Sequence, residues 1–154
     1  MSGAGVDSAE TGGGLPPLMP DLFEPLAEPG RFGLVGSRCR SCGHRCFPFT
    51  AHCPACQGGM DREVVGTHGK VYSYTVVCVK APFGLPEPYA VGYVDLAESS
   101  LRVFGLLDPA AIGSLEVGMP VEVTAMPLGV DKEGRRCLRP VFRAWTGVRE
   151  RSIP

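Results

Sequence analysis

Cys39-Arg40-Ser41-Cys42 and Cys53-Pro54-Ala55-Cys56 are two Cys-x-x-Cys segments in the first half of the chain. Two thiols separated by two residues can both face one metal ion when the chain between them makes a tight turn. Gly43 follows the first segment and permits a positive φ, so the chain can fold back and aim backbone N–H groups at the sulfurs. The spacing predicts a tetrahedral zinc site whose ligands are Cys39, Cys42, Cys53 and Cys56.

Two disulfides, or four unrelated thiols, are the alternative interpretation of these cysteines. The chain has seven cysteines, an odd count, and its N-terminus shows no basic segment followed by an apolar core. These features favour a reducing, cytoplasmic setting over a secreted disulfide framework. Four thiolates leave no open coordination position, so we expect one structural zinc per chain; the sequence leaves iron open as the metal.

Composition narrows the class of protein. The 154 residues are 44% hydrophobic and include 21 Gly and 15 Pro, which is typical of short strands joined by many turns. The formal net charge of −1 gives no general attraction to phosphate backbones or anionic lipids. No stretch approaches the roughly 20 apolar residues that span a bilayer. We therefore expect a mostly β protein that binds neither nucleic acid nor membrane.

We predict four segments along the chain: a flexible tail over residues 1–19, a short helix and zinc ribbon over 20–66, an OB-fold domain over 67–147 and a C-terminal tail over 148–154. The helix is predicted from Leu22, Phe23 and Leu26, which fall at helical spacing behind Asp21 as a cap. A short β-hairpin such as residues 44–50 would bring the two cysteine segments together.

The second half of the chain reads as five strands. Alternating β-branched and aromatic residues predict a strand from Gly69, and further strands follow near 89–96, 101–107, 121–126 and 138–145. The proline-rich segment 81–88 is predicted to be a loop, and Asp108-Pro109 to begin a helical turn. Five strands with a helical turn between the third and fourth match an OB-type barrel; a five-stranded sandwich is the alternative.

The ordered motifs resemble a family of acyl-CoA-associated proteins that join a rubredoxin-like zinc ribbon to an OB-fold domain. The matching residues are Cys39-x-x-Cys42-Gly43-His44, Phe47-Pro48, Cys53-Pro54-x-Cys56, the run from Gly66 to Val77, the run from Pro88 to Leu96, and Glu116 to Val121. The resemblance implies a non-catalytic accessory subunit that pairs with a thiolase-fold subunit, two copies of each chain, in an enzyme that makes or cleaves a carbon–carbon bond of an acyl-CoA. Some members instead accompany acyl-CoA hydratases.

Several side chains are candidates for contact with the partner or with coenzyme A; none is assigned a catalytic role. A proline-stiffened loop presents apolar groups at low entropic cost, and arginines can pair with phosphates or carboxylates. The candidates are Leu22, Phe23, Phe83, Leu85, Tyr89, Arg135, Arg136 and Arg139. Cys78 and Cys137 are interpreted as core or incidental thiols. Cys46 is close enough to the cysteine pairs to be a substitute ligand, but is expected to be a side chain of the ribbon hairpin. A nucleic-acid-binding OB protein that stacks bases on Tyr72, Tyr74 and Tyr93 is the less favoured alternative.

Overall fold

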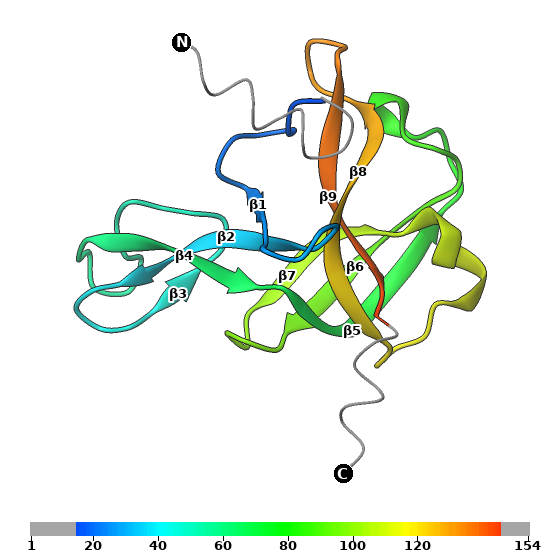
Figure 1. The fold of residues 1–154 in the computed structure, drawn as a ribbon. Helices are drawn as coiled ribbons and strands as arrows, with labels where there is room; N and C mark the ends of the chain where they lie inside the picture. Colours follow the sequence, from blue (N-terminus) through cyan, green and yellow to red (C-terminus); the bar gives the residue numbers. More distant parts are fainter. Residues whose placement is uncertain (1–14, 146–154) are drawn as a thin grey trace.

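A computed structural model describes residues 15–145 of the 154-residue chain. These residues form two β structures, a four-stranded sheet that projects to one side and a closed five-stranded barrel (Figure 1). The strands of the sheet are β1 (Phe23–Pro25), β2 (Phe32–Cys39), β3 (Arg45–Cys46) and β4 (Met60–Gly66). The strands of the barrel are β5 (His68–Val77), β6 (Tyr89–Leu96), β7 (Arg102–Leu107), β8 (Pro120–Val130) and β9 (Arg136–Ala144). The predicted mostly β fold is confirmed.

The projecting sheet, here called the ribbon sheet (β1–β4), is organised around β2. This strand pairs antiparallel with β1, β3 and β4, and its residues from Phe32 to Ser37 are buried. Gly36 lies where the sheet is tightest, because a Cβ there would stand 2.2 Å from the carbonyl oxygen of Cys46. Only glycine therefore allows the segment between the cysteine pairs to approach β2 this closely.

The short helix predicted behind Asp21 is wrong. Asp21 has a φ of 64°, which is not the extended geometry of an N-terminal helix cap. The following residues form β1, in which Phe23 is the register partner of Leu34. Phe23 is buried and its ring meets that of Phe32 edge-on, with centroids 5.8 Å apart. Long-range pairing with β2 thus overrides the local helical spacing.

The barrel has OB topology. Its strands are ordered β5-β6-β7-β9-β8, and β8 closes the barrel against β5. All neighbours are antiparallel except β7 and β9, which pair in parallel. The predicted helical turn is the 3₁₀ turn η2 (Pro109–Ser114), capped by the carboxylate of Asp108, which accepts from the N–H of Ala110 at 2.9 Å. A second 3₁₀ turn, η1 (Pro82–Gly84), lies in the predicted loop.

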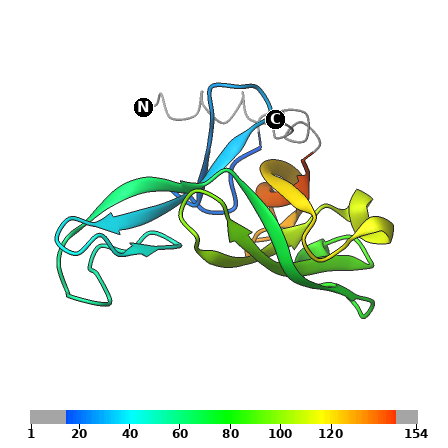
Figure 2. The ribbon, with the colours of Figure 1, turned by 90° about the horizontal axis from the view of Figure 1, so that it is seen from below.

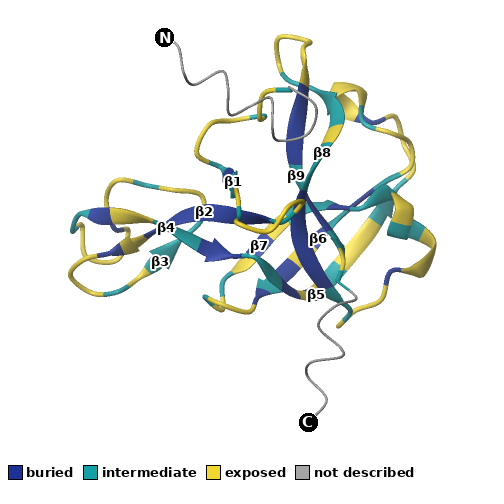
Figure 3. Ribbon diagram, viewed as in Figure 1, coloured by how far each residue is buried: buried dark blue, intermediate teal, exposed yellow. Residues whose placement is uncertain are grey.

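One core joins the barrel to the near end of the ribbon sheet. Strand β4 ends at Gly66 and β5 begins at His68, so the sheet runs almost directly into the barrel (Figure 2). The buried cluster combines residues of both parts: Phe23, Phe32, Leu34 and Val65 from the sheet with Val71, Val94, Leu96, Leu107, Val121, Val123, Leu138 and Phe142 from the barrel. The buried stretch of β2 reaches toward the barrel in Figure 3. The two parts therefore share their packing.

The predicted tails fall mostly on residues 1–14 and 146–154, which lie outside the described residues. Of the N-terminal segment that is described, Leu18 N–H donates to the Leu138 carbonyl at 2.8 Å, and Leu138 N–H donates to the Pro16 carbonyl at 2.8 Å. This short segment therefore lies along β9. Within residues 15–145, no helix is long and apolar enough to cross a membrane.

Candidate functional site

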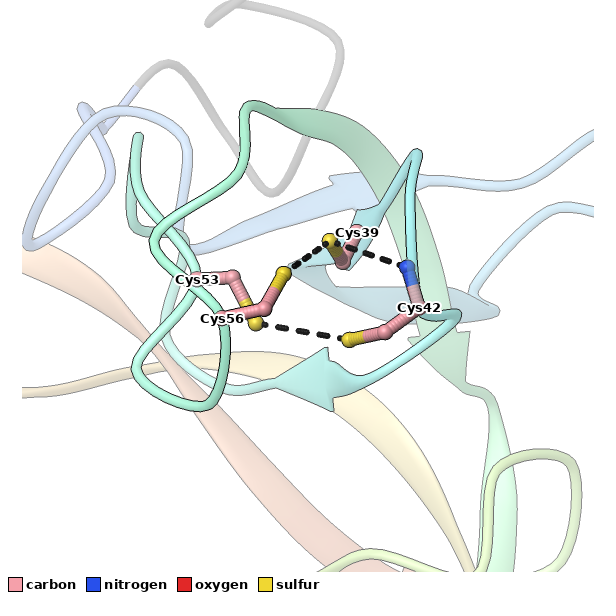
Figure 4. Close-up of side chains that lie close together, drawn as sticks. All are labelled: Cys39, Cys42, Cys53 and Cys56. Atoms are coloured by element: carbon pink, nitrogen blue, oxygen red, sulfur yellow. Dashed lines mark hydrogen bonds between the residues drawn. The ribbon is translucent and has the colours of Figure 1, made fainter.

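Four cysteines converge at the far end of the ribbon sheet, the end away from the barrel (Figure 4). Their Sγ atoms all lie within 4.8 Å of one another. The Sγ atoms of Cys39 and Cys56 are 3.5 Å apart, and those of Cys42 and Cys53 are 3.7 Å apart. Zn–S bonds of about 2.3 Å place the sulfurs of a regular tetrahedron about 3.8 Å apart. The four thiols therefore fit a tetrahedral zinc ion, as the sequence predicted.

Two similar turns hold these thiols in place. Gly43 N–H donates to the Cys39 carbonyl at 3.1 Å, and Gln57 N–H donates to the Cys53 carbonyl at 2.8 Å. Both residues have positive φ, 80° at Gly43 and 69° at Gln57. In each turn a backbone N–H also points at the first sulfur, from Ser41 to Cys39 and from Ala55 to Cys53, at 3.3 Å in both cases. Such N–H donors stabilise thiolates, so both turns suit a metal that needs anionic sulfur.

The thiols of the cluster influence one another's pKa. The backbone N–H of Cys42 lowers the pKa of the Cys39 thiol to about 6. At Cys56 the N–H of Gly58 acts in the same direction, but hydrogen bonds with the neighbouring thiols of Cys39 and Cys42 prevail and raise its pKa to about 12. Four thiolates this close together repel one another. A divalent metal bound among them would offset that repulsion and take the place of the thiol protons.

The segment between the two Cys-x-x-Cys pairs does not form the expected hairpin within residues 44–50. Strand β3, which contains Cys46, pairs with β2 and not with another part of residues 44–50. Cys46 packs against the buried cluster of Cys39, Cys53 and Met60 but is not one of the four converging thiols. Burial is the main factor that raises the pKa of its thiol. Cys46 is thus a side chain of the ribbon sheet that packs beside the four converging thiols.

Three of the candidates for partner contact lie in or next to the proline-rich loop at residues 81–88, and only one of them is exposed. Phe83 is 53% exposed and adopts a φ of 54°, while Leu85 and Tyr89 are half-buried. The Glu87 carboxylate accepts from the N–H of Ala81 at 2.7 Å and ties the two ends of the loop together. Phe83 is therefore presented on an ordered loop.

The three candidate arginines lie near the β8–β9 hairpin but have different surroundings. Arg135 is exposed and paired with Asp131 and Glu133. Arg136 is exposed at the start of β9. Arg139 is 9% exposed, and its guanidinium donates to the carbonyl oxygens of Leu128 and Val130, which holds the irregular end of β8. The two candidates from the N-terminal segment also differ, since Phe23 is buried in the core and Leu22 is half-buried.

His68 is the first residue of β5. Its Nδ1 is 3.2 Å from the carboxylate of Glu98, which also accepts from the hydroxyl of Thr67. Its ring packs on Trp145 with centroids 4.1 Å apart. Both rings line an open cleft of about 900 Å³. His68 thus links the start of β5 to Trp145, the residue that follows β9.

A groove that the sequence did not predict lies beside β7. It has a volume of about 150 Å³ and is lined by Leu22, Leu34, Phe47, Phe104, Gly105, Val123, Pro140, Val141 and Phe142. Alternation along β7 could have identified Phe104 as outward-facing, because Val103 is a core position. The groove itself combines segments more than 100 residues apart in the sequence, and no local pattern signals it.

Comparison with known proteins agrees with this architecture. Residues 62–125 match the family model for the C-terminal OB-fold domain of ChsH2. The chain is 36% identical to benzoylsuccinyl-CoA thiolase subunit BbsA of Thauera aromatica over 126 residues, which cover 80% of this chain and 85% of that protein. It is 35% identical to a DUF35 domain-containing scaffold protein of Methanocaldococcus jannaschii, over 60% of this chain and 67% of that protein.

A solved structure is also similar. A chain of the Ltp2-ChsH2(DUF35) aldolase aligns with a TM-score of 0.59 and 32% identity, covering 73% of this chain and 84% of that chain. The similarity to BbsA and to this aldolase chain extends well beyond the OB-fold domain. The chain therefore belongs to the DUF35 family, the family of ChsH2, and is a homologue of the BbsA thiolase subunits.

Proposed function

We propose that this chain is a non-catalytic accessory subunit of a heteromeric acyl-CoA thiolase or aldolase. In this proposal a thiolase-fold partner makes or cleaves a carbon–carbon bond of an acyl-CoA, and the partner needs this chain for activity. The similarity to BbsA over 85% of that thiolase subunit carries the proposal. The similarity to a chain of the Ltp2-ChsH2(DUF35) aldolase supports it from the structural side.

The metal in this proposal is one structural zinc per chain. The thiolates of Cys39, Cys42, Cys53 and Cys56 would fill all four positions of a tetrahedral ion, so the ion would hold the two turns together and would offer no site to a substrate. When bound, zinc supplies folding free energy to the far end of the ribbon sheet. The acyl-CoA would be held at the interface with the partner, in a cytoplasmic complex with two copies of each chain.

Assembly tests the proposal. The chain is co-expressed with a thiolase-fold protein from the same organism, and the mixture is separated by size-exclusion chromatography. We expect one peak with equal amounts of the two chains and one zinc per copy of this chain. As a control, Cys78→Ser should leave the zinc content and the co-elution unchanged, because Cys78 is an exposed thiol outside the cluster. Separate elution of two folded proteins at micromolar concentration would contradict the proposal.

A further inference from the structure

Three exposed aromatic rings lie on the neighbouring strands β5, β6 and β7 of the barrel. Tyr93 on β6 and Phe104 on β7 are register partners, and their rings meet edge-on with centroids 5.1 Å apart. Tyr72 on the adjacent β5 carries the Arg102 guanidinium over its ring, 3.4 Å from the centroid. Tyr72, Tyr93 and Phe104 are 49%, 44% and 58% exposed. We call these three rings the aromatic face.

The aromatic face continues into the apolar groove through Phe104, which belongs to both. Strand β7 pairs with β9 only at Leu106 and Leu107. The groove follows the remaining part of β7, and its other side is lined by Leu34 of β2 and by Leu22 and Phe47, which lie next to β1 and β3. At about 150 Å³ it has room for one apolar side chain of the size of an aromatic ring. The surface therefore spans the junction of the barrel and the ribbon sheet.

The charges at this surface favour a protein over a nucleic acid. Arg102 donates to both carboxylate oxygens of Asp95, at 2.6 Å and 3.1 Å, so the guanidinium beside Tyr72 is already neutralised. Nucleic-acid affinity depends on cations that remain free for phosphates, and the whole chain carries a net charge of −1. Tyrosine, phenylalanine and a paired arginine around an apolar pocket are instead the composition of a protein interface core.

We propose that the aromatic face and the adjoining groove are the surface on which the catalytic partner subunit docks, with one apolar side chain of the partner seated in the groove. This inference rests on the proposed function, which requires a partner but does not say where it binds. Docking here would cover exposed apolar area. It would also contact the barrel and the ribbon sheet together, so the partner would hold the two parts in one relative position.

Affinity measurements on the co-purified complex test the surface. Phe104→Ser and Tyr93→Ser remove rings that are largely exposed in the free chain, so each variant should keep its circular dichroism spectrum and melting temperature within a few degrees. We expect each to weaken binding of the purified partner about 30-fold or more, as central aromatic contacts do. Val117→Ser, at a site 68% exposed outside the aromatic face, should bind as the wild type does.

The outcomes separate this inference from the proposed function. If the wild-type chain binds the partner and the Phe104 and Tyr93 variants bind equally well, the surface is wrong while the proposed function stands. Loss of binding in Phe83→Ser alone would move the interface to the loop at residues 81–88. No binding by the wild type would overturn both. Salt-dependent binding of a labelled 20-nucleotide oligothymidylate that Tyr93→Ser abolishes would assign the face to nucleic acid instead.

Discussion

The barrel and the far end of the ribbon sheet differ in what holds them together. The barrel surrounds a large apolar core in which Leu96, Leu107 and Leu138 are each at most 2% exposed. The far end of the ribbon sheet buries only Cys39, Cys53 and Met60 as a cluster, and two of these three are metal-ligand candidates. Apolar burial can therefore stabilise the barrel, whereas the far end of the ribbon sheet has too little of it and needs a crosslink.

Strand β2 makes this difference visible within one element. Its first residues, Phe32 and Leu34, belong to the core shared with the barrel, and its last residue, Cys39, belongs to the cysteine cluster. Loss of the metal should therefore unfold the sheet from one end only. The near end should stay folded for as long as the barrel does.

Removal of the metal should have the largest effect. Structural zinc contributes on the order of 10 kcal/mol in small metal domains, so Cys39→Ser or Cys56→Ser should abolish stoichiometric zinc and expose the amides of β3 and of the outer half of β2. Hydrogen exchange with mass spectrometry, together with metal analysis, measures both. Uniform loss of protection in the barrel and the ribbon sheet would show that the two parts fold as one unit.

A cavity in the barrel should have the next largest effect. Leu107 is 1% exposed in the shared core, and Leu107→Ala should lower the free energy of unfolding by about 2–5 kcal/mol. Urea denaturation followed by circular dichroism measures the change. The zinc content of the folded fraction should stay at one per chain. Zinc loss from the folded fraction of this variant would contradict the separation of the two regions.

The ion cluster at the junction should contribute less. The Glu122 carboxylate is 2.8 Å from Arg143 of β9 and 3.5 Å from Arg31, which precedes β2. Both arginines are partly exposed, so Glu122→Gln should cost about 1–2 kcal/mol. Differential scanning calorimetry should show a lower melting temperature with the zinc retained. An unchanged melting temperature would mean that apolar packing alone joins the sheet to the barrel.

The Asp95–Arg102 pair beside the aromatic face should give a small dependence on pH. The hydrogen bond from Arg102 lowers the pKa of Asp95, against the opposing effect of burial. An acid with a lowered pKa in the folded state adds stability above its unfolded pKa of about 4, and that stability is lost as the pH falls further. NMR titration should show that Arg102→Gln raises the pKa of Asp95 toward its usual value. An identical titration curve in that variant would show that the pair is not formed in solution.

Local chemistry made the cysteine cluster and the barrel predictable. Two thiols at a fixed spacing and a glycine after Cys42 specify a turn, and alternation from Gly69 onward specifies strands. The conformation of Asp21 and the pairing of Phe23 with Leu34 could not be predicted in this way, because β2 determines them from a distance. The groove was hidden for the same reason, since Leu22, Phe47 and Phe142 meet only after folding.

Steady-state turnover tests the central claim most directly. An acyl-CoA substrate of the thiolase-like partner is supplied to the partner alone, to this chain alone and to the two together, at equal concentrations. A chain that supports chemistry without performing it should show no turnover alone, and activity should appear only in the mixture. Turnover by this chain alone, or full activity of the partner without it, would contradict the account.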